Sequence, residues 1–313
     1  MKLRLGVDLG GTKIEGVVLA DGAETIARLR LATPAGDYSA TVATITELVQ
    51  RLESEVGVST IPTGICTPGA INPATGLLKN ANSTCLNGMP LQQDLEAALQ
   101  RKLRLANDAD CLAISEATDG AAAGASGVFA VIIGTGVGGG FCHNGHLLRG
   151  VNAIAGEWGH NPLPWPEPSE LPGQTCWCGR KGCLETWISG PAMAADYRRA
   201  GGEILDAVAI VERAQQHEKL AVACLQTYKH RLARGLASVI NVLDPEVIVL
   251  GGGLSQIQSL YTDVPKLWGR FVFSDAVVTR LAAAQHGDAS GVRGAAWLWP
   301  KSSGGDSDNI RSG

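Results

Sequence analysis

Short apolar runs alternate with helically spaced apolar residues along the 313-residue chain. The continuous or alternating runs predict buried strands at residues 3–9, 14–19, 24–31, 62–70, 103–105, 128–133 and 247–250. Apolar residues three and four apart predict helices at 42–56, 91–99, 107–123, 204–215, 220–243 and 254–267, with a short last helix within 287–299. Strands and helices in this order predict an α/β fold.

Glycine-rich turns follow two of the predicted strands and lead each time into a second strand. The first turn is Gly10-Gly11-Thr12, and the second is the segment 134–140 before a strand from about residue 141. This repetition, with the chain length, predicts two lobes of similar construction. We expect a small lobe from residues 1–108 and about 288–300, a large lobe from 109–287, and a disordered tail at 301–313.

The charge pattern argues against a nucleic-acid or membrane partner. The formal net charge is −4, and the lysines and arginines form no run. No apolar stretch approaches the ~20 residues needed to cross a bilayer. The start MKLRLGVDLG lacks the apolar core of a signal peptide, so we expect a cytoplasmic protein. A phosphorylated ligand would then be held locally, by backbone N–H groups, helix N-termini and a metal ion.

The first glycine turn has the chemistry of a phosphate site. Gly10 and Gly11 leave backbone N–H groups open, Thr12 offers a hydroxyl, and Asp8 offers a carboxylate that can hold Mg²⁺ through its waters. An ordinary glycine-containing hairpin is the alternative interpretation.

The second glycine turn fits two classes of protein. Gly134, Gly136 and Gly139 satisfy the G-x-G-x-x-G pattern of dinucleotide-binding enzymes, but that pattern needs a helix directly after the glycines. A strand is expected there, so phosphate binding in a hairpin is preferred over a dinucleotide-dependent oxidoreductase. The glycines at 251–253, after the strand 247–250, allow a nucleoside to lie against the backbone, or simply form a tight turn.

The pair Asn107-Asp108 opens a predicted helix. An aspartate there can orient an acceptor hydroxyl and take its proton during phosphoryl transfer. A helix cap is the alternative role.

A compact set of soft ligands lies between residues 156 and 185. His160, Cys176, Cys178 and Cys183 match the donors of a closed tetrahedral zinc site, which we expect to be structural. Glu157 lies three residues before His160, so both side chains can face one polyol. The other cysteines are expected to be free thiols: Cys66, Cys85, Cys111, Cys142 and Cys224.

Taken in order, these motifs resemble the ROK (repressor, ORF, kinase) family of sugar kinases. The resemblance covers about residues 3–299 and implies an actin-like (ribonuclease H-like) fold of two lobes, with ATP and Mg²⁺ held between them. It implies that Asp108 is the general base and that Asp8 lies near Mg²⁺. It implies sugar contacts from Asn82, Asn107, Asp108, Glu157, His160 and Glu185. It implies nucleotide contacts from Asp8, Gly10, Gly11, Thr12, Lys13, Gly134, Thr135, Gly136, Gly138, Gly252 and Gly253.

The resemblance also suggests a reaction. Segments such as KNANSTCLNG and INVLDPEVIVLGGG are similar to bacterial fructokinases of the mannokinase type, so the expected reaction is ATP-dependent conversion of D-fructose to fructose 6-phosphate. Alternatives are a kinase for N-acetylglucosamine, N-acetylmannosamine, glucose or mannose, and a sugar sensor without turnover. The resemblance implies a homodimer.

Overall fold

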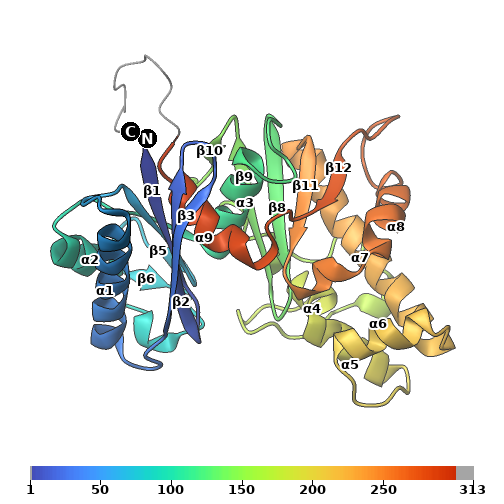
Figure 1. The fold of residues 1–313 in the computed structure, drawn as a ribbon. Coiled ribbons are helices and arrows are strands. Elements are labelled where there is room, and N and C mark those ends of the chain that lie inside the picture. The colour runs from blue at the N-terminus through green and yellow to red at the C-terminus, as the bar shows by residue number, and fades with distance from the viewer. Residues whose placement is uncertain (1, 301–313) are drawn as a thin grey trace.

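The computed structural model describes residues 2–300, and the expected tail at 301–313 lies outside the described residues. Two five-stranded sheets form the framework (Figure 1). The first has the order β3-β2-β1-β4-β7, from β1 (Leu3–Leu9), β2 (Lys13–Ala20), β3 (Thr25–Ala32), β4 (Thr63–Thr67) and β7 (Arg104–Asn107). The second has the order β10-β9-β8-β11-β12, from β8 (Gly127–Ile133), β9 (Val137–His143), β10 (His146–Leu147), β11 (Val247–Gly251) and β12 (Arg280–Ala283).

The two sheets share one plan, as the repeated glycine turns predicted. In each sheet three antiparallel strands are followed by two parallel ones. Asp8 on β1 is paired with Cys66 on β4, and Gly251 on β11 is paired with Ile132 on β8. The carboxyl ends of these parallel strands are where ligands bind in open α/β sheets.

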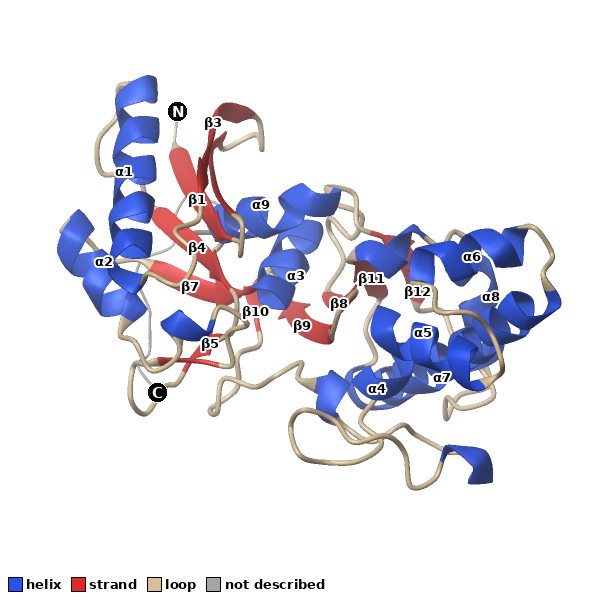
Figure 2. Cartoon of the chain, turned by 90° about the horizontal axis from the view of Figure 1, so that it is seen from below, coloured by secondary structure: helices blue, strands red, loops and turns tan. Residues whose placement is uncertain are grey.

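Two helices lie between the sheets (Figures 1 and 2). They are α3 (Asp108–Thr118), which packs on β8 and β9, and α9 (Ser290–Trp297), which packs on β1 and β4. The helices cross in direct backbone contact, because a Cβ on Gly294 would lie 1.9 Å from the Cys111 carbonyl oxygen. The C-terminal helix therefore joins the first sheet to the helix that begins at Asp108.

The outer face of the first sheet is covered by α1 (Tyr38–Val56), which packs beside α2 (Leu91–Leu99). The side chain of Asp37 caps α1 by accepting from the Ala40 N–H at 2.9 Å. Ile45, Leu48 and Leu52 on its inner face are fully buried, as the helical spacing predicted. The two-stranded β5 (Ala70–Ile71) and β6 (Leu78–Lys79) and a 3-10 turn at Thr84–Leu86 complete this half.

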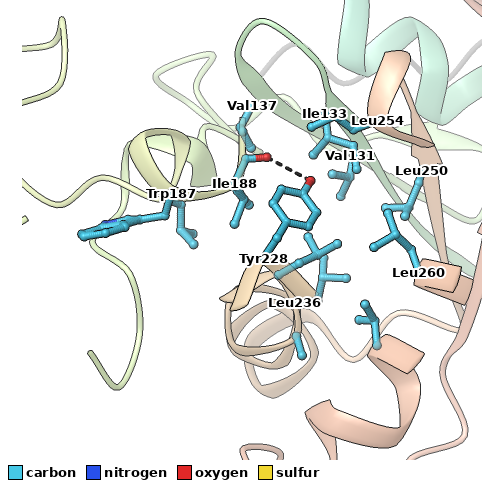
Figure 3. Packing of buried hydrophobic residues seen from close by; sticks show 14 of the residues in the cluster. Val131, Ile133, Val137, Trp187, Ile188, Tyr228, Leu236, Leu250, Leu254 and Leu260 are labelled. Atoms are coloured by element: carbon cyan, nitrogen blue, oxygen red, sulfur yellow. Dashed lines mark hydrogen bonds between the residues drawn. The ribbon is translucent and has the colours of Figure 1, made fainter. Parts of the chain in front are cut away.

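The second sheet is covered on its outer side by a group of helices, α4 (Glu185–Ile188), α5 (Gly190–Arg199), α6 (Ala207–Gln215), α7 (Lys219–Leu243) and α8 (Ser259–Trp268). Tyr228 of α7 is buried among apolar side chains of this core and donates its hydroxyl to the Ile188 carbonyl at 3.0 Å (Figure 3). Because Trp187 and Ile188 are also buried, the short helix α4 is held firmly, and with it Glu185 at its start. Among residues 2–300, no helix is long and apolar enough to cross a bilayer.

Some boundaries differ from the sequence prediction. Helix α3 ends at Thr118 and not near residue 123, because the buried Glu116 carboxylate accepts the Ala121 N–H at 2.8 Å and closes a turn there. The expected helix at 254–267 is a 3-10 turn, Gly253–Gln256, followed by α8. The helix expected from 204 begins at Ala207, after its cap Asp206. Helix α5 and strand β12 were not predicted.

Candidate active site between the two sheets

A cavity of about 850 Å³ is lined by residues from both halves of the chain. It brings together eight of the predicted site residues: Asn82, Asn107, Asp108, Gly138, Glu157, His160, Cys178 and Glu185. The turn from Gly10 to Lys13, the glycines at 134 and 136 with Thr135, and Gly252 and Gly253 are not among its lining residues. The cavity is therefore the expected sugar end of the site, and its size suits a small ligand.

Asp108 lines this cavity at the junction between β7 and α3. Asn107 is the helix cap, because its Oδ1 accepts the Asp110 N–H at 2.7 Å, and its amide NH₂ remains to donate to a ligand. Asp108 is the first helical residue, and its Oδ1 accepts the Ala109 N–H at 2.8 Å. Protein atoms that crowd the carboxylate desolvate it and raise the pKa of Asp108, which makes it a stronger base than an ordinary aspartate.

Asp110 and Arg149 are charged residues near the site that the sequence interpretation missed. Asp110 is 9% exposed, and its Oδ1 has no hydrogen-bond partner within residues 2–300. Burial raises the pKa of Asp110 to about 7, and the charge of Arg149 offsets only part of this effect. The Arg149 guanidinium donates to the Leu105 carbonyl, which ties the segment before Gly156 to β7. No local sequence pattern pointed to Asp110 or Arg149, because Asp110 becomes buried only in the folded structure.

Glu157 and His160 flank a 3-10 turn, Trp158–His160, that lies directly on β9. Gly156 has φ 95°, and a Cβ on it would lie 2.2 Å from the Gly139 carbonyl oxygen. The Trp158 indole N–H donates to the Gly138 carbonyl at 3.0 Å. Both contacts fix the turn against the strand, and Glu157 and His160 line the same cavity.

Glu185 joins the sugar end of the site to the second glycine turn. Its Oε2 accepts the Val137 N–H at 2.9 Å, and its Oε1 accepts the Trp177 indole N–H at 2.7 Å. A Cβ on Gly136 would lie 2.8 Å from Oε2, so the glycine turn passes directly beside this carboxylate. Trp177 is a third residue that the sequence interpretation missed, because its contact with Glu185 depends on how the cysteine segment folds.

The predicted zinc ligands form one cluster. Donor atoms of His160, Cys176, Cys178 and Cys183 all lie within 4.8 Å of one another. The Cys176 Sγ is 3.6 Å from the His160 Nδ1, and the Cys178 Sγ is 3.6 Å from the Cys183 Sγ. A tetrahedral zinc with ordinary bond lengths separates its ligands by about 3.6–3.8 Å. The four residues therefore fit a closed zinc site in donor type and in spacing.

The loop between His160 and Cys176 has a second anchor. Glu170 is buried and accepts from Arg231 at 2.8 Å and from Arg234 at 2.7 Å, both on α7. Burial alone would raise the pKa of Glu170, but these guanidinium hydrogen bonds outweigh it and lower the pKa to about 2. The segment that carries the zinc ligands is thus attached to the helical core independently of the metal.

The first glycine turn is a tight hairpin in which the Gly10 N–H donates to the Lys13 carbonyl at 3.0 Å. Gly11 lines a small cavity of about 240 Å³ together with Asn82. The Lys13 Nζ lies 3.5 Å from a carboxylate oxygen of Glu15. Burial raises the pKa of Asp8 to about 6, and the nearby Asp108 charge adds to the effect. Asp8 and Asp108 therefore share one electrostatic environment.

The second glycine turn enters a strand, because Ile133 of β8 pairs directly with Val137 of β9. No helix follows the glycines, so the structural requirement of the dinucleotide-binding pattern is absent there. A Cβ on Gly134 would lie 3.8 Å from the Gly253 N, which places the turn beside the glycines after β11. The two predicted nucleotide-binding turns therefore meet at the carboxyl ends of β8 and β11.

Comparisons with known proteins agree with this geometry. The sequence model of the ROK family matches residues 4–302. An N-acetyl-D-glucosamine kinase of Photobacterium profundum is 39% identical over 297 residues, 94% of this chain and 98% of that protein. An N-acetylgalactosamine kinase of a Shewanella species is 36% identical over 94% of this chain and 95% of that protein. A ROK hexokinase from Thermus thermophilus has a TM-score of 0.84 at 30% identity, over 94% of this chain and 97% of that one. These neighbours confirm the expected two-lobed, actin-like α/β fold.

Proposed function

Because the chain belongs to the ROK family and is a sugar kinase, we propose that it transfers the γ-phosphoryl group of ATP to the 6-hydroxyl of a hexose. The observation that supports this most is the position of Asp108, which faces the cavity where Glu157, His160 and Glu185 converge. Phosphoryl transfer to a sugar hydroxyl requires a base that takes the proton of that hydroxyl, beside groups that bind the other hydroxyls. Asp108, with its raised pKa, is placed to be this base.

The residues divide into two roles in this proposal. Asp108 orients the acceptor hydroxyl and takes its proton as the new bond to phosphorus forms. Asn82, Asn107, Glu157, His160 and Glu185 bind the remaining sugar hydroxyls. Bound Mg²⁺ would supply positive charge for the phosphates, and Asp8, whose pKa burial raises although the Lys13 charge offsets part of the effect, is the residue that would hold its waters.

The nucleotide is proposed to lie against the glycine turns. Gly10, Gly11 and Thr12, with Gly134, Thr135, Gly136 and Gly138, would line the phosphates, and Gly252 and Gly253 would face the nucleoside. The Gly10 N–H already donates to the Lys13 carbonyl and the Gly134 N–H to the Gly136 carbonyl, both at 3.0 Å, so these two glycines would shape the turns and not donate to phosphate. The N–H of Val137 is already used by Glu185, so a phosphate in this turn depends on its other N–H groups. Lys13 reaches a phosphate only by leaving Glu15, its partner at 3.5 Å.

N-acetyl-D-glucosamine is the first candidate sugar, because the relatives described above carry the names of N-acetyl-D-glucosamine and N-acetylgalactosamine kinases. These names favour the alternative expectation over D-fructose. D-Fructose is kept as the second candidate, because segments such as KNANSTCLNG resemble fructokinases of the mannokinase type.

The test is an ADP-formation assay with ATP, Mg²⁺ and a panel of sugars: N-acetylglucosamine, N-acetylgalactosamine, N-acetylmannosamine, fructose, glucose and mannose. The highest kcat/KM identifies the substrate class. Asp108→Asn is expected to lower kcat by at least about 10²-fold, since general-base assistance contributes about that much or more. Asp275→Asn, the same chemical change at an exposed position, is the matched control.

Two outcomes would contradict the proposal. Substantial turnover by purified Asp108→Asn would remove Asp108 from the role of base. Sugar binding by calorimetry without ADP formation from any sugar would indicate a sensor and not an enzyme.

A further inference from the structure

Trp177 occupies an unusual place between two of the proposed zinc ligands, Cys176 and Cys178. Its side chain is 71% exposed, although large aromatic residues are usually mostly buried. It lines the 850 Å³ cavity and also an adjoining cavity of about 790 Å³, and both cavities include Asn80 and Asn82 of the opposite lobe. The indole therefore stands at the rim of the proposed sugar site.

The contacts of this indole lead to two proposed sugar-binding residues. Its N–H donates to the Glu185 Oε1 at 2.7 Å. Its ring meets the His160 ring edge to face, with centroids 4.9 Å apart and an interplanar angle of 84°. The other Glu185 oxygen is held by the Val137 N–H at 2.9 Å. Glu185 is thus fixed at both oxygens, and each oxygen keeps a lone pair for a ligand hydroxyl.

We propose that Trp177 is a positioning residue for the sugar, which holds the Glu185 carboxylate and the His160 ring in their ligand-binding orientations. This inference rests on the proposed function, because it assigns Trp177 to the same sugar end of the cavity. The two anchors of Glu185 come from different sources. Val137 N–H belongs to a strand of the second sheet, whereas Trp177 N–H belongs to the cysteine segment. Within residues 2–300, the Trp177 N–H is the nitrogen donor from the cysteine segment to this carboxylate. The Cys176 Sγ lies 4.0 Å from the same oxygen, where a zinc-bound thiolate would have no proton to donate.

The consequence of losing the indole N–H follows from the freedom of a glutamate side chain. Without the indole N–H, the Val137 N–H remains as the strong donor to Glu185 among the described residues. The carboxylate can then rotate about that hydrogen bond, and a sugar must order it on binding. A charge-assisted hydrogen bond contributes about one to two powers of ten to such an equilibrium. Trp177→Phe, which removes the N–H but keeps an aromatic ring, is expected to raise KM for the sugar about tenfold. Its kcat should change less than about threefold, and KM for ATP should stay the same.

The experiment compares four variants with the wild-type protein. Trp177→Phe is tested beside Trp165→Phe, a matched control at another partly exposed tryptophan whose ring packs on Phe271 away from the cavity. Zinc content is measured for each protein, and it should be equal in all of them. In the double variant Trp177→Phe/Glu185→Gln, the KM for sugar should be no higher than in Glu185→Gln alone, because Trp177 acts through that carboxylate.

Three kinds of result would overturn the inference. An unchanged sugar KM in Trp177→Phe, or an equal rise in Trp165→Phe, would show that the indole N–H does not position the sugar site. Multiplicative effects in the double variant would show that Trp177 does not act through Glu185. Loss of zinc from Trp177→Phe would assign the residue to metal retention instead. Absence of any sugar turnover in the wild-type protein is distinguishable from all of these, and it would refute the proposed function itself.

Discussion

Replacement of Asp110 by asparagine is expected to stabilise the protein at high pH and to have little effect at low pH. Burial raises the pKa of Asp110 to about 7, compared with an ordinary value of 3.8 for the unfolded chain. Between these two values the folded state holds a proton that the unfolded state has lost, so stability falls as the pH rises. Above pH 7 the full cost of a buried charge is present, and asparagine removes it.

The magnitude follows from the same two values. At about 1.4 kcal/mol per pH unit, a pKa of about 7 against 3.8 corresponds to a cost of about 4 kcal/mol at pH 8.5, and about 1 kcal/mol at pH 4.5. Asp110→Asn should therefore gain about 3 kcal/mol relative to the wild-type protein between these two conditions. In urea unfolding, the midpoint of the variant minus that of the wild-type protein should therefore be roughly 1 M larger at pH 8.5 than at pH 4.5.

The assay records urea midpoints of both proteins at pH 4.5 and pH 8.5, so that effects common to both proteins, such as loss of metal at low pH, cancel. Asp275→Asn at an exposed position is the control and should shift little at either pH. An equal effect of Asp110→Asn at the two pH values would refute the reasoning, because it would show that the carboxyl is not buried as a charge.

Four further outcomes are expected. Because the pKa of Asp108 is raised, kcat/KM should decline on acidification with a midpoint above that of an ordinary aspartate, and full activity at pH 4 would contradict this. Removal of zinc by a chelator should raise KM for the sugar more than KM for ATP, and an unchanged sugar affinity would place His160 away from the substrate. Gly156→Ala should lower sugar affinity at least about tenfold in calorimetry, because its Cβ would lie 2.2 Å from the Gly139 carbonyl oxygen; normal affinity would show that the turn can shift. Light scattering should give twice the 32.5 kDa chain mass, as the family resemblance implies for a homodimer.

Much of the fold could be predicted because its signals are local. Strand β1 and the turn after it follow from a buried apolar run and adjacent glycines, and helix α2 begins and ends at the predicted residues Leu91 and Leu99. The prediction was wrong at the end of α3, where Glu116 is held by the Gln285 N–H and the Ser290 hydroxyl from far along the chain. Helix α3 stops at Thr118 because the buried Glu116 binds the following turn, and the periodicity of the alanines after it carries no trace of that contact.

The candidate site, too, could be predicted only where its signals are local. The zinc donors are close in sequence, so residue type and spacing were enough to predict one cluster from His160 to Cys183. The first helical turn after Asn107 was also visible, since capping is a local interaction. The role of Arg149 was not visible because its partner Leu105 lies 44 residues away, and that of Trp177 was not visible because its contact with Glu185 depends on how the cysteine segment folds.

The sequence by itself determined the order of strands and helices, the two glycine turns and the set of soft ligands, because apolar period, glycine placement and donor spacing act within a few residues. Only the tertiary structure decided that Glu185 meets the Val137 amide 48 residues earlier in the chain, and that Asp110 is buried without a hydrogen-bond partner at its Oδ1 within residues 2–300. Burial and long-range contact arise when the two sheets pack around α3 and α9, and these packed distances set the desolvation and the hydrogen bonds on which the proposed chemistry depends.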